Sequence, residues 1–442
     1  MKTFWTRLRE LRRYPSGIAG LLIIAILIVV SICTVIAIPY GHVVRLWRGA
    51  DGVWLDNPRH AWPKWINLFP GVNRPETIVL RSGHEGTKTT SEDGVVTIAL
   101  PFDYPYDGFP KELNLFFTAR YAQFRPYVDA LWVTPDGREI PLIQRGITAE
   151  ERYVVAADAT LKANLGISPE VGLFREPGPP GATPTNQKGR YELRIEGLLF
   201  EPDSDFDVKL VVYGQVHGLA GTDHLRRDLA VALLWGTPIA LVFGFVAAVG
   251  ISFAQFIFGA ISAWYGRWTD TTIQFLTKVE MVTPNLPIYM MIAMFFSRSI
   301  WVTLAAVVVF NLFGGGVLTY RSMFLQVKES AYVEAARAYG ASNLRIVFRY
   351  LIPRVFPVLV PGFVTAIPAF VFLEAGLAFL GLGDPSLPTW GKTLNESGIA
   401  ALLQGHYYWV IQPAILLMVT GFAFALIGFA LDRVFNPRLR TI

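Results

Sequence analysis

Residues 329–353 read ESAYVEAARAYGASNLRIVFRYLIP and lie between two long apolar segments of the chain. Residues Ser330 to Tyr339 are rich in Ala and other helix formers, and Gly340 follows them as a residue that commonly ends a helix. Ser342 is a favourable N-cap for a second helix, and Pro353 is expected to close that helix. The stretch therefore predicts a short helix, a sharp bend and a second helix with basic side chains on its exposed side.

The surface of the predicted first helix suits close contact with another protein. Small side chains such as Ala335 and Ala336 let a partner approach the helix, and Glu334 offers a charged contact. The alternative is an ordinary amphipathic hairpin, so the sequence on either side of the stretch has to decide.

The composition of the whole chain is that of a membrane protein. Of its 442 residues, 52% are hydrophobic and 17% are charged, and the mean hydropathy is +0.40. Soluble domains have roughly 45–50% apolar and about 25% charged residues. The apolar residues are clustered in long segments, which indicates contact with lipid. The net charge of +5 is then explained by basic loops beside a membrane, so nucleic-acid binding is not expected.

Six apolar segments are long enough to cross a membrane about 30 Å thick. The first follows the basic residues Lys2, Arg7, Arg9, Arg12 and Arg13, and we interpret it as an uncleaved helix rather than a removed signal peptide. This segment contains Cys33, and because Cys33 is the single cysteine of the whole sequence, an intramolecular disulfide is ruled out. The expected spans are Gly17–Ile38, Leu229–Ala260, Ile273–Phe296, Ile300–Tyr320, Val355–Leu380 and Tyr408–Leu431. Pro284 and Pro287 are expected to kink the third span.

The basic residues predict the orientation of these spans. They concentrate in the loop that contains residues 329–353 and in the C-terminal tail, and the positive-inside rule places both in the cytoplasm. With six spans, both termini are then cytoplasmic. The loop residues are Arg321, Lys328, Arg337, Arg345, Arg349 and Arg354, and those of the tail are Arg433, Arg438 and Arg440.

A different composition separates the first span from the second. Charged residues, Pro and Gly rise between residues 42 and 222, and several segments alternate apolar and polar residues as half-buried strands do. Pro135-Asp136-Gly137 is a turn signal. We expect a β-rich extracytoplasmic domain at 42–222, between a first part at 1–41 and a five-helix part at 223–442 whose cytoplasmic loop covers about 323–354.

Residues 329–353 resemble the EAA loop of ABC importer permeases. The family pattern is Glu-Ala-Ala, three residues, Gly, and an apolar-apolar-Pro ending, which here falls on Glu334-Ala335-Ala336, Gly340 and Leu351-Ile352-Pro353. Other segments resemble the C-type subunit of dipeptide and oligopeptide permeases. These segments are Gly221-Thr222-Asp223, Arg227-Asp228, Leu373-Glu374-Ala375, Phe379–Gly383 and Pro388-Thr389-Trp390-Gly391.

The chain departs from that family in three places. Arg226 stands where the family usually has Gly, the ending Leu431–Arg438 matches only loosely, and the insertion of about 180 residues is longer than expected. These departures leave the substrate and the docking of a binding protein open, but not the coupling to an ATPase.

The resemblance implies an all-α polytopic permease with the type I importer fold and a β-rich insertion. Its partners would be a second permease subunit, two ABC ATPase subunits and an extracytoplasmic solute-binding protein, in a cell (inner) membrane. The chain itself would be no enzyme and bind no cofactor, since ATP and Mg²⁺ would sit on the ATPase subunits. The expected ATPase-coupling residues are Glu334, Ala335, Ala336, Arg337, Gly340, Ala341, Arg345 and Pro353.

Three further residues are candidates for the translocation path or a subunit interface. Glu374 lies inside the fifth span, where an ionisable group is costly unless it faces a cavity or a partner; a group hydrogen-bonded near the outer end is an equal alternative. Trp390 and Asp228 belong to the matching segments. The six histidines show no metal-ligand spacing, and Gly391-Lys392-Thr393 lacks the rest of a phosphate-binding loop.

The sequence thus predicts the transmembrane permease of an ATP-driven importer of peptides or similar small solutes. One alternative is a membrane receptor that senses a ligand through the β-rich domain, and another is a polytopic membrane enzyme, although clustered acids or histidines are missing. The resemblance favours peptides, while related permeases carry nickel or sugars, so the substrate and the residues that touch it stay open.

Overall fold

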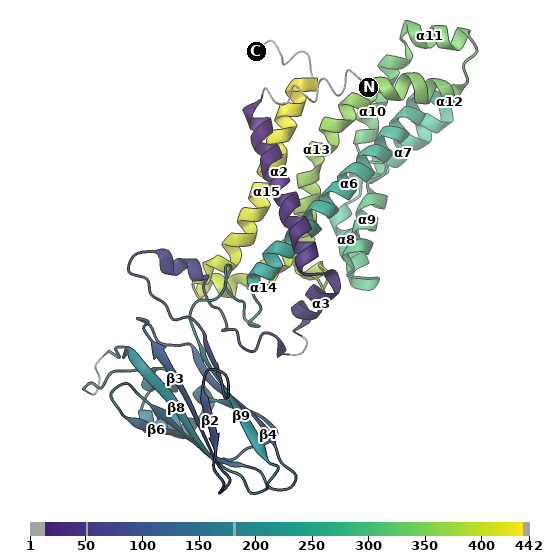
Figure 1. The fold of residues 1–442 in the computed structure, drawn as a ribbon. Helices are drawn as coiled ribbons and strands as arrows, with labels where there is room; N and C mark the ends of the chain where they lie inside the picture. The colour runs from purple at the N-terminus through teal and green to yellow at the C-terminus, as the bar shows by residue number, and fades with distance from the viewer. Residues whose placement is uncertain (1–13, 50–51, 180–182, 436–442) are drawn as a thin grey trace. The chain divides into compact units, whose positions relative to one another are not determined.

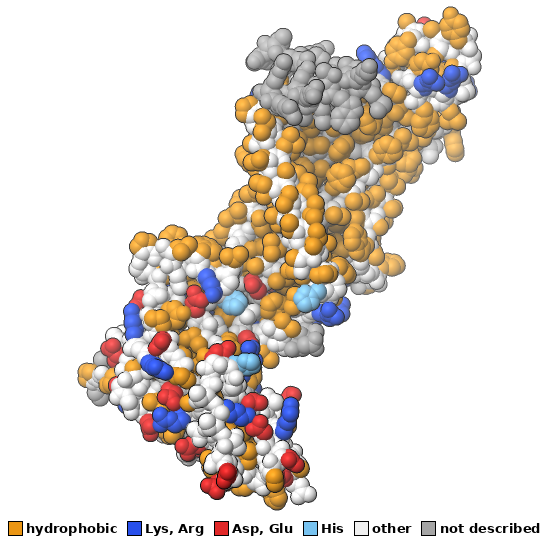
Figure 2. Space-filling view, in the orientation of Figure 1, with side chains coloured by type: hydrophobic (Ala, Val, Ile, Leu, Met, Phe, Trp, Pro, Cys, Tyr) orange, Lys and Arg blue, Asp and Glu red, His pale blue; other side chains and the backbone are white. Residues whose placement is uncertain are grey.

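A computed structural model describes residues 14–49, 52–179 and 183–435. It divides into two compact units, a helical unit (residues up to 48 and from 231 onward) and a β unit (residues 49–230). Hydrophobic side chains cover the helical unit, whereas charged side chains gather on the β unit (Figure 2). The basic residues before position 14, and Arg438 and Arg440 of the tail, lie outside the described residues.

The β unit is built from two antiparallel sheets (Figure 1). The four-stranded sheet has the order β1-β9-β4-β7 and the five-stranded sheet the order β2-β3-β8-β5-β6. The core lies between them, with a cluster of aromatic rings around Trp132 and Tyr191. The strands are β1 (Ile78–Arg81), β2 (Thr87–Thr90), β3 (Val95–Tyr104), β4 (Glu112–Arg120), β5 (Tyr127–Val133), β6 (Glu139–Gly146), β7 (Glu150–Val154), β8 (Gly189–Leu198) and β9 (Asp205–Tyr213).

The alternating sequence explains these strands. In β3 and β8 every second side chain is buried in the core, as a sheet with one covered face requires. The predicted turn joins β5 to β6: Gly137 has φ +83° and donates its N–H to the Thr134 carbonyl at 2.9 Å. Short helices complete the unit at η3 (Lys64–Leu68), η4 (Val155–Ala157), α4 (Ala159–Leu165) and α5 (Pro169–Gly172).

Among the described residues, four helices are long and apolar enough to cross a membrane: Pro15–Ala37, Leu229–Tyr265, Asn343–Leu382 and Tyr407–Val434. The element bounds are α2 (Pro15–Ala37), α3 (Tyr40–Arg48), α6 (Leu229–Tyr265), α7 (Arg267–Val282), α8 (Asn285–Phe295), α9 (Ile300–Phe310), α10 (Gly316–Lys328), α11 (Ala331–Ala338), α12 (Asn343–Ile346), η5 (Val347–Leu351), α13 (Ile352–Leu377), η6 (Ala378–Leu382), α14 (Trp390–Leu403) and α15 (Tyr407–Phe435).

The other two expected spans are broken helices, so six continuous helices are not what the described residues form. The expected span 273–296 divides into α7 and α8 at Thr283, next to the predicted kink at Pro284. The expected span 300–320 divides into α9 and α10 at residues 311–315. Gly314 and Gly315 end that segment and Gly316 begins α10, and Gly is a poor helix former. Hydropathy alone does not predict either break, because apolar residues lie on both sides of each break.

Helices from the two ends of the chain pack together in the helical unit. α2 lies along α15 (Figure 1), and a Cβ on Gly20 would come within 2.6 Å of the Ala423 carbonyl. Only a glycine permits this approach. The short helix α3 also belongs here, because Val43 and Trp47 are buried, whereas the expected boundary at residue 42 assigns it to the β-rich part.

Candidate functional site: the loop between α10 and α13

The expected first helix of the loop is α11, and Gly340 ends it. Gly340 has φ +75°; its N–H donates to the Arg337 carbonyl, and the Ala341 N–H donates to the Ala336 carbonyl, each at 3.0 Å. This pair of hydrogen bonds is a Schellman motif, which needs a left-handed residue in its centre. A Cβ at Gly340 would meet no atom within 4 Å, so the sharp bend is open to the outside.

α11 has one buried and one exposed side. Val333 and Ala336 face a hydrophobic cluster formed with α6, α10 and α13. Glu334 and Ala335 are exposed, and Tyr339 is 92% exposed at the bend. An aromatic ring that projects this far from a well-packed helix is typical of a contact with another protein. Ala336 is therefore a packing residue rather than part of the presented surface.

Trp264 at the end of α6 is the platform on which α11 rests. The Arg337 guanidinium lies 4.9 Å from the centre of the Trp264 ring, and the Lys328 ammonium lies 5.7 Å from it. The Lys328 Nζ also donates to the Ala263 and Trp264 carbonyls at 2.8 and 3.1 Å. A cation at this helix end satisfies free carbonyls and the helix dipole. Arg337 thus joins α11 to a membrane-spanning helix, and Lys328 joins the end of α10 to the same helix.

An ion pair holds the neighbouring helices together. Arg321 of α10 donates two hydrogen bonds of 2.6 Å to the Asp270 carboxylate of α7, and Ser262 of α6 donates a third. The hydrogen bonds from Arg321 hold the pKa of Asp270 well below its usual range. The carboxylate therefore stays charged at neutral and mildly acidic pH, and bidentate geometry fixes both direction and distance.

The second helix of the loop differs from the prediction. α12 begins after Ser342, as expected, but Pro353 does not close the helix: residues 343–382 form one continuous apolar element. The turn at residues 347–351 is a π-helix, which widens the helix just before the residue that has no N–H to donate. Pro353 then stands in the first turn of α13, and Arg345 is exposed on α12.

The tentative path residues do not lie in the loop. Glu374 is buried in α13 with Thr389 as a side-chain partner. Trp390 at the start of α14 is buried too; it donates from Nε1 to the Leu233 carbonyl at 2.9 Å and packs on Gly236 of α6. Its contacts are those of a packing residue between helices.

Asp228 and the departing residue Arg226 belong to the β unit. Burial raises the pKa of Asp228 and lowers that of nearby His217. Arg226 has φ +69°, which explains a family preference for Gly at this place. Its side chain forms an ion pair with Glu112 of β4 and lies 4.2 Å from the centre of the Tyr213 ring. The Arg side chain thus fastens the end of this segment to the four-stranded sheet.

A polar cluster at the broken helices was not predicted from the sequence. Asn311 lies at the break between α9 and α10, and its side-chain amide donates to the Tyr289 hydroxyl of α8 at 2.6 Å. Its main-chain carbonyl accepts a hydrogen bond from the Gln255 side chain of α6 at 2.8 Å. The Asn285 amide lies at 3.4 Å from Asn311 Oδ1. Polar side chains inside membrane helices commonly mark functional sites. The sequence did contain a signal for this cluster, because Asn311 and three consecutive glycines at 314–316 interrupt an otherwise apolar segment.

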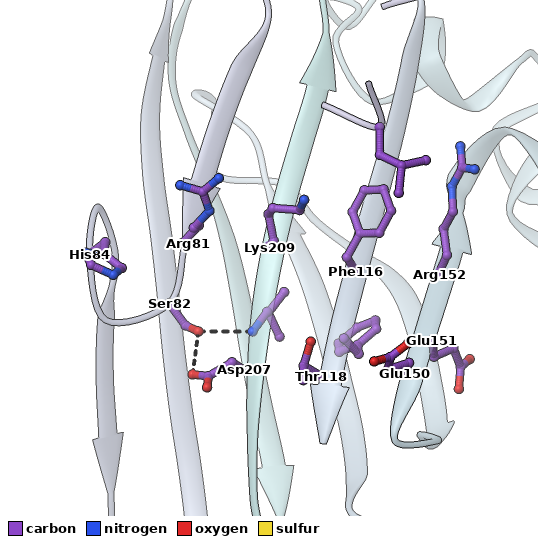
Figure 3. Close-up of a pocket in the computed structure, with 13 residues that line it drawn as sticks. Arg81, Ser82, His84, Phe116, Thr118, Glu150, Glu151, Arg152, Asp207 and Lys209 are labelled. Carbon is purple, nitrogen blue, oxygen red and sulfur yellow. Dashed lines mark hydrogen bonds between the residues drawn. The ribbon is translucent and has the colours of Figure 1, made fainter. Parts of the chain in front are cut away.

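The β unit has an open groove of about 670 Å³ on the four-stranded sheet (Figure 3). Strand register places Arg81, Lys209, Phe116 and Arg152 in one row across four strands. Two residues further along the strands lie Asp207, Thr118 and Glu150. A row of cations and a row of acids therefore stand about 7 Å apart, with the Phe116 ring between two of the cations.

Comparisons with known proteins agree with the loop and the apolar helices. Residues 255–441 match the family described as binding-protein-dependent transport system inner membrane component. A dipeptide transport system permease from Alkalihalophilus pseudofirmus is 31% identical over 50% of this chain and 72% of its own length. A glutathione transport system permease from Pectobacterium atrosepticum is 30% identical over 50% and 73%.

One further relative and one solved structure are also similar to this chain. An oligopeptide transport system permease from Bacillus subtilis is 29% identical over 50% of this chain and 72% of its own length. The solved structure of an inward-facing MetNI methionine ABC transporter chain aligns with a TM-score of 0.38 at 18% identity, over 47% of this chain and 96% of that one. On its sequence, this chain belongs to the family of inner-membrane components of binding-protein-dependent transport systems.

Proposed function

We propose that this chain is the permease of an ATP-driven importer of peptides or similar small solutes, and that the loop between α10 and α13 couples it to a cytoplasmic ATPase. The observation that carries the proposal is the bend at Gly340, which presents the exposed side of α11 while Trp264 holds its other side. Similar permeases named for dipeptides, oligopeptides and glutathione favour peptidic substrates.

In this proposal the chain forms half of a translocation path, and a second permease subunit forms the other half. Two ATPase subunits bind and hydrolyse ATP, and the chain itself carries out no covalent chemistry. The residues that contact the ATPase are Glu334, Ala335, Tyr339, Gly340 and Arg345. Arg337, Ala336 and Ala341 hold the loop in shape, and motion passes from α11 through Trp264 into α6. Alternating access follows when the helices re-aim the cavity between the subunits.

The polar cluster around Asn311 is our proposed path-lining group. Broken helices expose backbone and polar side chains that a solute can replace as hydrogen-bond partners. Glu374 and Trp390 are proposed to support the outer part of the helices without contacting the solute.

The β unit is proposed to receive the solute-binding protein on the extracytoplasmic side. The groove on its four-stranded sheet offers charges of both signs for such a contact. Replacing residues 49–228 with a short Gly-Ser linker should abolish uptake driven by the binding protein. Normal uptake by that variant would contradict this role.

The coupling role is tested by ATPase activity of the complex purified with its co-expressed partners. Gly340→Asp places a charge at the bend, where an added Cβ would meet no described atom within 4 Å, so we expect loss of substrate-stimulated hydrolysis while the complex still assembles. Gly340→Asn has nearly the same size without the charge and should keep more of the stimulation.

Gly405→Asp is the matched control. Gly405 has φ +79°, and a Cβ there also meets no atom within 4 Å, but it lies between α14 and α15 rather than in the coupling loop. Its stimulation should stay near that of the unmodified chain. Equal effects at both glycines, or a chain that copurifies with no ATPase, would overturn the proposal.

A further inference from the structure

The β unit carries an exposed apolar patch that the groove and the core do not explain. We define the rim patch as Trp65, Leu68, Phe69 and Leu219, whose exposed fractions are 45%, 85%, 56% and 79%. Large apolar side chains exposed to this degree and grouped together mark an interaction surface on a protein.

Hydrogen bonds hold the rim patch in one piece. Trp65 Nε1 donates to the Leu219 carbonyl at 3.0 Å, and the Lys64 N–H donates to the Gly218 carbonyl at 2.9 Å. The rings of Trp65 and Phe69 meet edge to face with centres 6.3 Å apart. The Trp65 N–H is thereby satisfied by the protein, and the patch presents apolar surface.

The patch is tied closely to the start of a membrane helix. Leu229 is the first residue of α6, and its N–H donates to the Gly221 carbonyl at 3.0 Å. Leu219 stands only two residues before Gly221, and each residue extends the chain by at most about 3.6 Å. The backbone of Leu219 therefore lies within about 15 Å of the first turn of α6.

Charged residues and exposed apolar side chains indicate where along α6 the membrane surface lies. Arg226, Arg227 and Asp228 come directly before the helix, and charged side chains do not enter hydrocarbon readily. The exposed aliphatic and Phe side chains of α6 begin at Leu234 and continue to Phe253, and Tyr265 is exposed at the far end of the helix. The 20 residues from Leu234 to Phe253 rise about 30 Å, which is the thickness of the hydrocarbon layer. The boundary thus falls between residues 228 and 234.

We propose that the rim patch lies in the headgroup region of the bilayer, on the side where α6 begins. Trp at such a patch suits the interface, where an aromatic body meets apolar chains and polar groups together. The occupant is the lipid surface, because the chain itself keeps the patch within reach of it and its exposed side chains are apolar. The inference rests on the membrane location of α6 and not on the solute or the ATPase.

The test uses the full-length chain in lipid nanodiscs. Cys33, which is exposed on α2, is first replaced by Ser, and Leu68→Cys then carries an environment-sensitive NBD label. We expect blue-shifted emission, strong quenching by lipids with a nitroxide at a shallow acyl position, and at least threefold weaker quenching by aqueous iodide than at the control site.

The control is Phe124→Cys, which is 60% exposed at the other end of the sandwich. Register pairs Arg120 with Asp205 and Glu112 with Tyr213, so Phe124 follows the end of β4 that is distant from residues 214–219. Its label should be quenched by iodide and not by the lipids. Two further results would overturn the proposal: equal iodide quenching at both sites, or a Leu68 label shielded only after a second permease or binding protein is added.

Discussion

Two positions with positive φ show how single residues shape this molecule. Gly340 has the conformation that its sequence motif predicts, and the structure adds that a side chain there would point into open space. Arg226 also has a positive φ, although a residue with a Cβ rarely adopts this backbone conformation. Its ion pair with Glu112 and its contact with the Tyr213 ring offset the unfavourable φ, which no pattern within residues 221–228 could predict.

Replacing Arg226 separates these two contributions. We expect Arg226→Ala to lower the free energy of unfolding of the β unit by about 3–5 kcal/mol, since it leaves Glu112 unpaired. Arg226→Gly should lose about 1–2 kcal/mol less, because Gly adopts positive φ freely. Urea titration of the full chain in detergent, read by pulse proteolysis, measures both.

Arg81→Ala is the control for that series. Its pair with Asp56 is exposed and 3.5 Å long, and such a pair contributes less than about 1 kcal/mol. If all three variants lost equally little, the Arg226 ion pair would have no structural role.

Among the elements, the helices show where sequence reasoning succeeds and where it stops. Long apolar stretches located α2, α6, α13 and α15, since hydropathy depends only on local composition. The break between α9 and α10 depends on a side chain of another helix: a Cβ on Gly316 would come within 2.0 Å of Gln255 Oε1. Contacts between segments about 60 residues apart are invisible to a local pattern.

Asn311→Ala tests whether the break matters for transport. Each hydrogen bond inside a helix bundle contributes about 1 kcal/mol, and the change removes the side-chain bonds of Asn311 to Tyr289 and Asn285. We expect uptake of labelled peptide into proteoliposomes to fall about tenfold, the effect of roughly 1.4 kcal/mol on one step.

Asn395→Ala is the matched control, because Asn395 of α14 is exposed and its amide donates to the Phe379 carbonyl of η6 at 2.6 Å, away from the Asn311 cluster. That variant should transport normally. An Asn311 variant with normal uptake would exclude the cluster from the path.

For the whole molecule, the sequence predicted a membrane part with a β-rich insertion, and both are present. The β-rich character of the insertion followed from alternation and turn signals, whereas the groove did not, because it requires the register of four strands. The orientation across the membrane stays a prediction from the positions of Lys and Arg.

Cysteine labelling tests that orientation. In a Cys33→Ser background, Tyr339→Cys should react with a membrane-impermeant maleimide only after cells are permeabilised, since the positive-inside rule places the loop in the cytoplasm. Phe124→Cys should react in intact cells. Both sites are well exposed, so poor access within the chain would not explain a missing signal. Reaction at Tyr339→Cys in intact cells would reverse the topology.

One hydrogen bond between α6 and α2 bears on how a domain could be inserted between these two helices during evolution. Trp235 Nε1 of α6 donates to the Ile38 carbonyl at the end of α2, at 3.1 Å. The helices themselves therefore keep the end of α2, where the chain leaves the helical unit, near the start of α6, where it enters that unit again. The entropy of closing a loop grows only slowly with its length. A whole domain can therefore be inserted, lost or exchanged at this point without rebuilding the helices on either side of it.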